Sequence, residues 1–336
     1  MGMKHYNKGE NPTSGRRSAL RREWGMLLFG LLMATALPAL AAALLGLSPA
    51  KEEHGLSGDT PVRICRHGEG EAEELPLERV LILSLAATNA SDAPAASLEA
   101  QAVVLRSRAV WWIDYCDGDD VDGKGGDALH TLCDSPAHGL PYLAEEELSA
   151  LLGETETAAR IDAAEQALQA TRGQVLCYEG EVIPAMLHGS SAQRTRAVEE
   201  LPWLTAAATP EEPPRTVHRI AAEDARAALA ARFGLTLSAD PEEWGISTAP
   251  ADGITETVRV SGAELTATVF ADALGLPSGN LRIEVTPAAL LITCTGEGSG
   301  CGLSREGAAV YARGGLCWQE ILAHYYPDCT LGQMWR

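Results

Sequence analysis

The stretch AASLEAQAVVLRSRAVWW, residues 95–112, decides how the rest of the chain is interpreted. Four apolar side chains recur in it at spacings of three and four residues, namely Leu98, Ala102, Leu105 and Ala109. Such spacing places them on one face of a helix, and no Gly or Pro interrupts the run. The sequence therefore predicts a core helix over these residues, with its few charged side chains, such as Arg106, in solvent.

The composition is that of a folded, acidic protein. The 336 residues are 46% hydrophobic and 21% charged, which excludes wholesale disorder. This length allows one large domain or two smaller ones. The net charge of −20 should repel nucleic acid and anionic lipid. We therefore expect no nucleic-acid partner.

The start of the chain predicts a membrane anchor. Residues 24–47 carry no charge and are long enough to span a bilayer. Four arginines lie just before them, Arg16, Arg17, Arg21 and Arg22. The positive-inside rule then places residues 1–23 in the cytoplasm and the body outside the cell membrane. A cleaved signal peptide ending near alanines 41–43 is the alternative to a single-pass anchor.

Eight cysteines in a body expected outside the cytoplasm permit disulfides. Cys294 and Cys301 are close in sequence, as are Cys317 and Cys329. Either pair could be bridged, and free buried thiols are the alternative.

Hydrophobic periodicity and turn residues predict the order of elements in the body. Helices are expected over residues 143–153, 157–171, 221–233 and 303–313. Strands are expected over residues 62–65, 174–178, 182–188, 258–260 and 264–270. The turn-rich segment 210–215 is the best candidate for a domain boundary, and the Gly-rich run 296–302 suggests close backbone approach or positive φ.

Three separated blocks carry a family resemblance. LEAQAVVLRSRAV, residues 98–110, closely resembles the signature helix of the stage II sporulation protein D family, usually written EALKAQAVAARTYA. TRGQVLCYEGEVIPAMLHGSSAQRT, residues 171–195, resembles its Thr-Arg-Gly-Gln strand, turn and His/Ser-rich loop. Residues 296–308 and the Tyr-Tyr-Pro at 325–327 resemble its Gly-rich loop and ending. The resemblance covers about residues 75–331.

The resemblance implies an α+β fold, a mixed two-lobed body with a glycan cleft, preceded by one transmembrane helix. The expected divisions follow the chain: a cytoplasmic basic tail (1–23), the transmembrane anchor (24–47), a linker (48–70), an N-terminal lobe with the signature helix (71–209) and a C-terminal lobe with the Gly-rich loop (210–336).

The resemblance also implies a function. Members of the family are lytic transglycosylases, which cut peptidoglycan glycan strands without adding water. They act in septal wall remodelling and engulfment during endospore formation, with a partner amidase and a multi-pass membrane anchor protein. No cofactor is required for this chemistry.

The position of the catalytic acid is the main departure from the family. Aligned without gaps, the family's catalytic glutamate corresponds to Ala96, which can neither donate nor accept a proton. Glu99 lies three residues later, about one helical turn away, and is the candidate acid and base. A solvated glutamate at the helix start is its structural alternative. The alternative function is a catalytically degenerate protein that binds glycan or recruits or activates the amidase. A general wall-binding module unconnected with sporulation also stays open.

Other matched positions are expected to bind substrate. They are Gln101 and Arg106 in the signature helix, Ser190, Ser191 and Thr195 in the Ser-rich loop, and Ser304 in the Gly-rich loop. Each has a structural alternative, because Arg106 could pair with a buried carboxylate and serines often cap helices. His188 is expected to be a satisfied histidine at a strand end.

A loop after the signature helix holds a possible zinc site. His130, Cys133 and His138 are ligand types that zinc accepts, at short spacing. The resemblance also implies a Cys/His cluster here. An unmetallated loop or a disulfide between Cys116 and Cys133 is the alternative.

Overall fold

The computed structural model describes residues 56–66, 72–116, 130–134, 140–251 and 254–335. The predicted anchor at residues 24–47 lies outside them. No helix in the described part of the chain is long and apolar enough to cross a membrane.

Helices and short strands are mixed along the chain, so the protein is α+β as predicted. The first half contains β1 (Pro61–Cys65), β2 (Ala72–Pro76), α2 (Leu77–Thr88), α3 (Ala95–Cys116), β3 (His130–Cys133), α4 (Glu145–Leu152), α5 (Glu154–Ala170), β4 (Gln174–Tyr178), β5 (Glu181–Val182) and β6 (Leu187–His188). The second half contains β7 (Arg215–Ala221), α6 (Ala222–Phe233), the 3-10 helix η1 (Pro241–Trp244), β8 (Ser247–Ala251), β9 (Ile254–Val260), β10 (Ala263–Thr266), α7 (Ala267–Ala273), β11 (Leu281–Thr286), β12 (Ala289–Thr295), β13 (Leu303–Ser304), α8 (Arg305–Arg313), α9 (Trp318–Tyr325) and β14 (Thr330–Gln333).

The strands form small sheets. β1 lies between β2 and β3 and runs parallel to β3, while β4 lies between β14 and β5. β6 and β13 form a short parallel pair, which joins residues more than a hundred positions apart. Two antiparallel sheets, in the orders β10-β9-β8 and β11-β12-β7, are built from the segment between residues 215 and 295.

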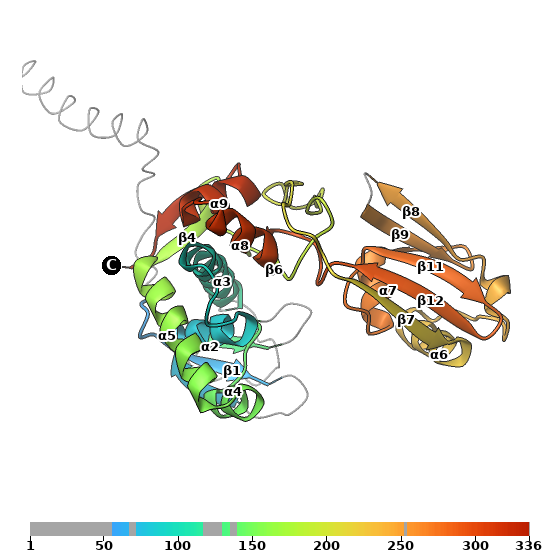
Figure 1. Cartoon of the computed structure of the whole chain (residues 1–336), viewed down its shortest axis with the longest axis horizontal. Coiled ribbons are helices and arrows are strands. Elements are labelled where there is room, and N and C mark those ends of the chain that lie inside the picture. Colours follow the sequence, from blue (N-terminus) through green and yellow to red (C-terminus); the bar gives the residue numbers. More distant parts are fainter. Residues whose placement is uncertain (1–55, 67–71, 117–129, 135–139, 252–253, 336) are drawn as a thin grey trace, which may run out of the picture. The chain divides into compact units, whose positions relative to one another are not determined.

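Helix α3 is buried on two sides. The four residues that were predicted to share a face, Leu98, Ala102, Leu105 and Ala109, all lie in one cluster with side chains of α2 and α5. The opposite face, including Val103 and Val104, packs against α8 and α9. Figure 1 shows α3 between these helices. The residues that decide the fold are therefore shared by two hydrophobic cores.

The prediction that the charges of this helix are solvated is wrong for Arg106, whose side chain is fully buried. Its Nε donates to Glu78 at 2.9 Å, and its Nη1 donates to the carbonyl of Thr171 at 2.9 Å. Nη2 donates to the carbonyl of Leu168 at 3.2 Å. Burial is tolerated because the guanidinium is paired and hydrogen-bonded.

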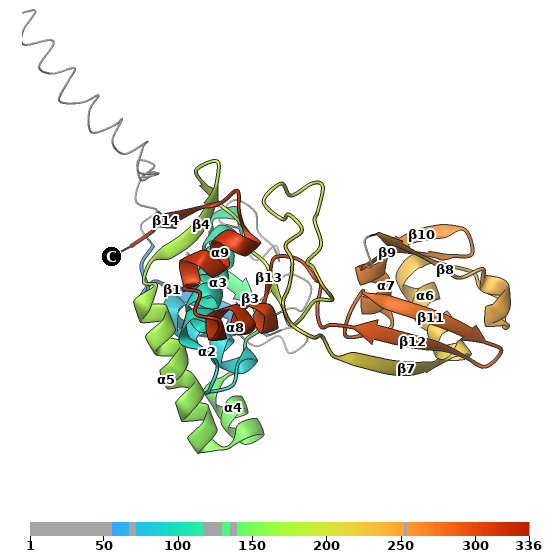
Figure 2. The same cartoon turned by 45° about the horizontal axis from the view of Figure 1, so that its top comes forward.

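A third cluster is formed between residues 225 and 294, where α6 and α7 pack with β9, β11 and β12 (Figure 2). The predicted boundary at residue 210 lies just before it. The packing nevertheless divides the chain differently, because Ile321 and Tyr325 of α9 share a cluster with Val103. The chain leaves the α3 cores near residue 215 and returns to them after residue 300.

Most predicted elements appear with shifted ends. The helices predicted over 143–153 and 157–171 are α4 and α5, which are separated by Gly153 at φ 84°. The strand predicted over 264–270 is wrong in its second half, where α7 begins at Ala267. Ala267, Phe270 and Ala271 then lie at helical spacing and are buried in the third cluster. That packing overrides the β propensity of Val269 and Phe270.

The two disulfides that the sequence permitted are not formed. The structure instead has free thiols, the alternative that the sequence left open, at Cys294, Cys301, Cys317 and Cys329. Burial raises the pKa of the Cys329 thiol to about 12, with the Asp328 charge acting in the same direction. A thiol of this kind is almost fully protonated at neutral pH and is a poor nucleophile.

Candidate functional site

Two loops from distant parts of the chain are bonded together. We call residues 189–196 the serine loop and residues 296–302 the glycine loop. The amide of Ser190 donates to the carbonyl of Glu297 at 3.1 Å, and the amide of Glu297 donates to the carbonyl of Ser190 at 2.9 Å. The amide of Arg196 donates to the carbonyl of Gly300 at 2.7 Å. These bonds lie beside the β6–β13 pair and fix the two loops relative to each other.

The glycines of the second loop permit this close approach, as the sequence predicted. A Cβ on Gly296, which has φ +84°, would lie 2.4 Å from the carbonyl oxygen of Ser190. A Cβ on Gly302, which has φ +71°, would lie 2.2 Å from the carbonyl oxygen of Met186. Both the backbone conformation and the contact therefore require glycine.

A buried histidine joins the loops through its side chain. His188 Nδ1 lies 3.0 Å from the carbonyl oxygen of Cys301 and must carry the proton, so Nε2 accepts from the hydroxyl of Ser191. Burial, helped by the nearby charges of Arg305 and Arg196, lowers the pKa of His188 to about 4. The imidazole is therefore neutral at physiological pH, which agrees with the satisfied histidine expected from the sequence.

A carboxylate from the predicted boundary segment completes the connection. Glu211 Oε1 accepts from the hydroxyl of Ser304 at 2.6 Å and from the amide of Ser191 at 2.9 Å. Ser304 in turn accepts from the amide of Gly307 and caps α8. The role of Glu211 could not be predicted, because residues 210–215 have the composition of a turn-rich connection. An acidic residue in such a connection is too weak a signal to predict this role.

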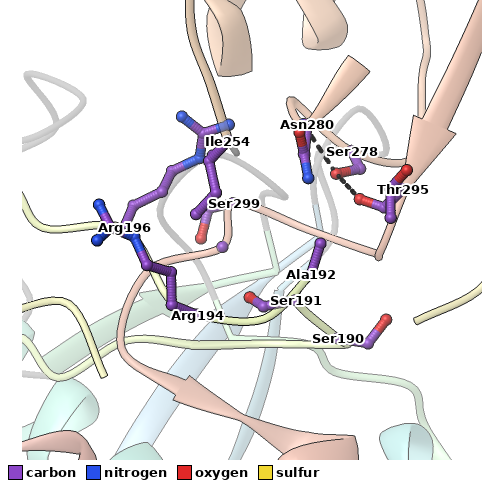
Figure 3. Close-up of a pocket in the computed structure, with 11 residues that line it drawn as sticks. Ser190, Ser191, Ala192, Arg194, Arg196, Ile254, Ser278, Asn280, Thr295 and Ser299 are labelled. Atoms are coloured by element: carbon purple, nitrogen blue, oxygen red, sulfur yellow. Dashed lines mark hydrogen bonds between the residues drawn. The ribbon is translucent and has the colours of Figure 1, made fainter. Parts of the chain in front are cut away.

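A small polar pocket lies where these loops meet the sheets of the third cluster (Figure 3). Its empty space is about 230 Å³, which includes solvent at its open mouth. Its lining is Ser190, Ser191, Ala192, Arg194, Arg196, Ile254, Ser278, Asn280, Thr295, Ser299 and Gly300. Hydroxyl, amide and guanidinium groups dominate this lining, which suits a polar ligand such as a sugar better than an apolar one.

The predicted substrate-binding residues divide into two groups. Ser190 and Ser191 line the pocket. Thr195 accepts from the amide of Ala207 at 2.9 Å and so holds the segment beside the serine loop. Ser304 is fully buried as the α8 cap. Ser304 therefore has the structural role that was its alternative, that of a serine capping a helix.

Gln101 and Arg106 are both enclosed by protein. Gln101 is 1% exposed and exchanges two hydrogen bonds with Asn89, at 2.9 and 3.0 Å. Arg106 pairs with Glu78, as its structural alternative anticipated. Neither side chain lines the pocket. The geometry therefore favours a structural role for both residues.

Glu99 lies in the second turn of α3 and is partly buried. Its burial raises the pKa of the carboxyl above the ordinary value. It makes no hydrogen bond or ion pair to any other residue in the described part of the chain. Ala96, one turn earlier, packs against the α8–α9 core.

Arg305, which follows the Ser304 cap, donates to the carbonyl of Thr88 and thus ties the start of α8 to the segment that precedes α3.

The structure places only one of the three predicted zinc-binding side chains, that of Cys133. His138 and the side chain of His130 lie outside the described residues. Cys133 lies in β3, opposite Cys65 of β1 in the strand register. The described residues contain no group of three His, Cys, Asp or Glu side chains that could hold a metal ion.

The fold and the site define an α+β protein in which two interlocked loops border a pocket rich in hydroxyl groups. The model of the SpoIID family, described as Stage II sporulation protein, matches residues 66–178. The chain is also 22% identical over 277 residues to Stage II sporulation protein D of Bacillus subtilis (strain 168), covering 81% of this chain and 79% of that protein. This part of the chain is therefore similar to the SpoIID family.

Proposed function

We propose that the protein is a sporulation protein that acts on peptidoglycan glycan strands as a lytic transglycosylase, with Glu99 as its acid and base. Similarity to the SpoIID family supports the sporulation role. The observation that carries the chemistry is the partly buried, unpaired Glu99 carboxyl on α3, whose pKa is raised by burial. A raised pKa keeps more of the acid protonated near neutral pH, which general acid catalysis requires.

The proposed reaction uses one carboxyl group twice. Glu99 gives its proton to the glycosidic oxygen as the bond from that oxygen to the anomeric carbon breaks. The resulting carboxylate then takes the proton from the 6-hydroxyl of the same sugar as that oxygen bonds to the anomeric carbon. The product carries a 1,6-anhydro ring, and no water is consumed.

The test uses the full chain, purified in detergent, on glycan strands without stem peptides, with products read by mass spectrometry. Wild type should release fragments with anhydro ends, and Glu99→Gln should lose at least a hundredfold in rate, because an amide cannot supply the proton. Glu154→Gln, which changes an exposed glutamate at the start of α5, is the matched control and should retain full activity. Equal rates for wild type and Glu99→Gln would exclude Glu99 as the acid.

A second function is favoured by one specific residue. Ala96 stands where the family resemblance places the catalytic glutamate, and it packs against apolar side chains. The protein would then be a degenerate family member that binds glycan or holds the partner amidase. In that case wild type releases no fragments, whereas Ala96→Glu restores cleavage because the site around the missing acid is intact.

We also propose the setting in which the protein works. Residues 24–47 would anchor it in the cell membrane with residues 1–23 in the cytoplasm, where the four arginines of the basic tail are retained. The body would then meet the septal wall, beside a partner amidase and a multi-pass anchor protein. Zinc on His130, Cys133 and His138 stays a prediction, and no step of the proposed reaction requires it.

A further inference from the structure

Arg196 is an enclosed arginine that uses only part of its hydrogen-bonding capacity. Its side chain is 7% exposed, and Nη1 donates to Glu256 at 3.0 Å. Nη2 is buried without a hydrogen-bond partner. A buried charged donor with no partner is costly and rare in folded proteins, and it calls for an explanation.

The structure holds this side chain in place without any ligand. The backbone amide of Arg196 donates to the carbonyl of Gly300, and its side chain passes close to that residue. A Cβ on Gly300 would lie 3.3 Å from Nε and 3.5 Å from Cδ of Arg196. The guanidinium is thus positioned by the serine and glycine loops together, which lowers the entropic cost of binding a partner.

The surroundings of Arg196 point to the chemistry of that partner. In Figure 3 the two arginines of the pocket lie to one side of it, with Ser190 and Ser191 along its floor and Ser278 and Asn280 opposite. Glu256 offsets one positive charge, and its side chain is 40% exposed. A ligand that offers an acceptor to Nη2 of Arg196 and carries several hydroxyl groups matches this arrangement, and a guanidinium is well suited to a carboxylate.

We propose that this pocket is a subsite for a carboxylate-bearing sugar, with the carboxylate on Nη2 of Arg196 and the sugar's polar groups on the serine hydroxyls. The proposal rests on the proposed function, which makes peptidoglycan glycan the ligand. Two carboxylates of that polymer have the required chemistry. One is the lactyl carboxylate of a muramic acid without a peptide, and the other is the terminal carboxylate of a stem peptide.

The experiment measures binding of the full chain in detergent to the disaccharide of N-acetylglucosamine and N-acetylmuramic acid by calorimetry. Three forms of the disaccharide are compared: the free lactyl acid, its neutral amide, and the form whose lactyl group carries a dipeptide with a free terminal carboxylate. The form that binds tightest among the charged two identifies the source of the carboxylate. The neutral amide should bind at least tenfold more weakly than that form.

Matched variants test the residue itself. Arg196→Gln should weaken binding of the charged form at least tenfold and leave binding of the neutral amide unchanged. Arg232→Gln removes the same charge from an exposed position at the end of α6 and should change neither. Glu256→Gln leaves the guanidinium uncompensated and should tighten binding of the charged form severalfold. Thermal melting of each variant checks that it is folded.

Two negative results are distinguishable. If wild type binds the charged and neutral forms equally and Arg196→Gln changes nothing, the carboxylate subsite is wrong while glycan binding stands. If wild type binds none of the three sugars, the proposed function itself is contradicted.

Discussion

At the scale of single residues, His188 makes the stability of the protein depend on pH. Its pKa falls from an ordinary 6.5 to about 4 in the folded protein, so the unfolded chain binds the proton more tightly. The stabilising contribution is fully present above pH 6.5 and is lost as the pH falls toward 4. Over this window the loss amounts to about 3 kcal/mol.

Urea unfolding at pH 7 and pH 4.5 measures this contribution. The difference in unfolding free energy between wild type and His188→Gln should be large at pH 7 and should shrink markedly at pH 4.5. His218→Gln, on β7, serves as the control for exchanging a histidine for glutamine elsewhere in the protein. A wild-type advantage over His188→Gln that stays constant with pH would contradict the buried neutral histidine.

Gly302 offers a second prediction at this scale. Gly302→Ala places a methyl group against the carbonyl of Met186 in a backbone conformation that favours glycine. We expect a loss of about 3 kcal/mol or more in unfolding free energy, since strain and steric conflict add. Gly315→Ala, at φ +95° with open space around it, tests strain alone and should cost only about 1 kcal/mol. Equal losses in the two variants would argue against the interlocked loops.

At the scale of elements, Arg106 joins α3 to its neighbours. It bonds Glu78 of α2, the carbonyl of Leu168 in α5 and the carbonyl of Gln174 in β4. Arg106→Met leaves a partly buried carboxylate and several carbonyls without a donor, so we expect a loss of about 3 kcal/mol. Arg160→Met, which removes a surface pair with Glu156, should cost about 0.5 kcal/mol or less. Chemical denaturation compares the two, and a small loss at Arg106 would contradict its joining role.

The elements also show where sequence patterns succeed and fail. Apolar spacing predicted the buried face of α3 because that face depends on local periodicity alone. The full set of partners of Arg106 could not be predicted, since they come from three segments that meet only in the fold. The switch from β10 to α7 was missed because packing of Phe270 in the third cluster outweighs its local β propensity.

At the scale of the whole molecule, the pocket could not be predicted from the sequence, because its residues come from segments that meet only in the fold. Ser190 and Ser191 were singled out from the family pattern, but Arg196, Ser278 and Asn280 were not. The last two come from the segment between residues 215 and 295, which carries no recognisable signal for a site. Backbone bonds from the glycine loop to the serine loop and to Pro277 bring these residues to one place.

The anchor is a prediction about the whole chain. Full-length protein should sediment with membranes and resist extraction by high salt, because an apolar span is held by the hydrophobic effect rather than by charge. A chain that lacks residues 1–47 should remain in the supernatant. Replacing Leu27 and Leu28 by alanine is a mild control that should not release the protein. Release of the full-length protein by salt alone would contradict a membrane-spanning segment.

We propose that the protein cuts glycan strands by internal transfer to a sugar hydroxyl. The most direct measurement is the mass of the fragments released by the full chain in water labelled with heavy oxygen. We predict anhydro-ended fragments without heavy oxygen, which disappear in Glu99→Gln. Fragments that contain one heavy oxygen at the new end would show hydrolysis and contradict the claim.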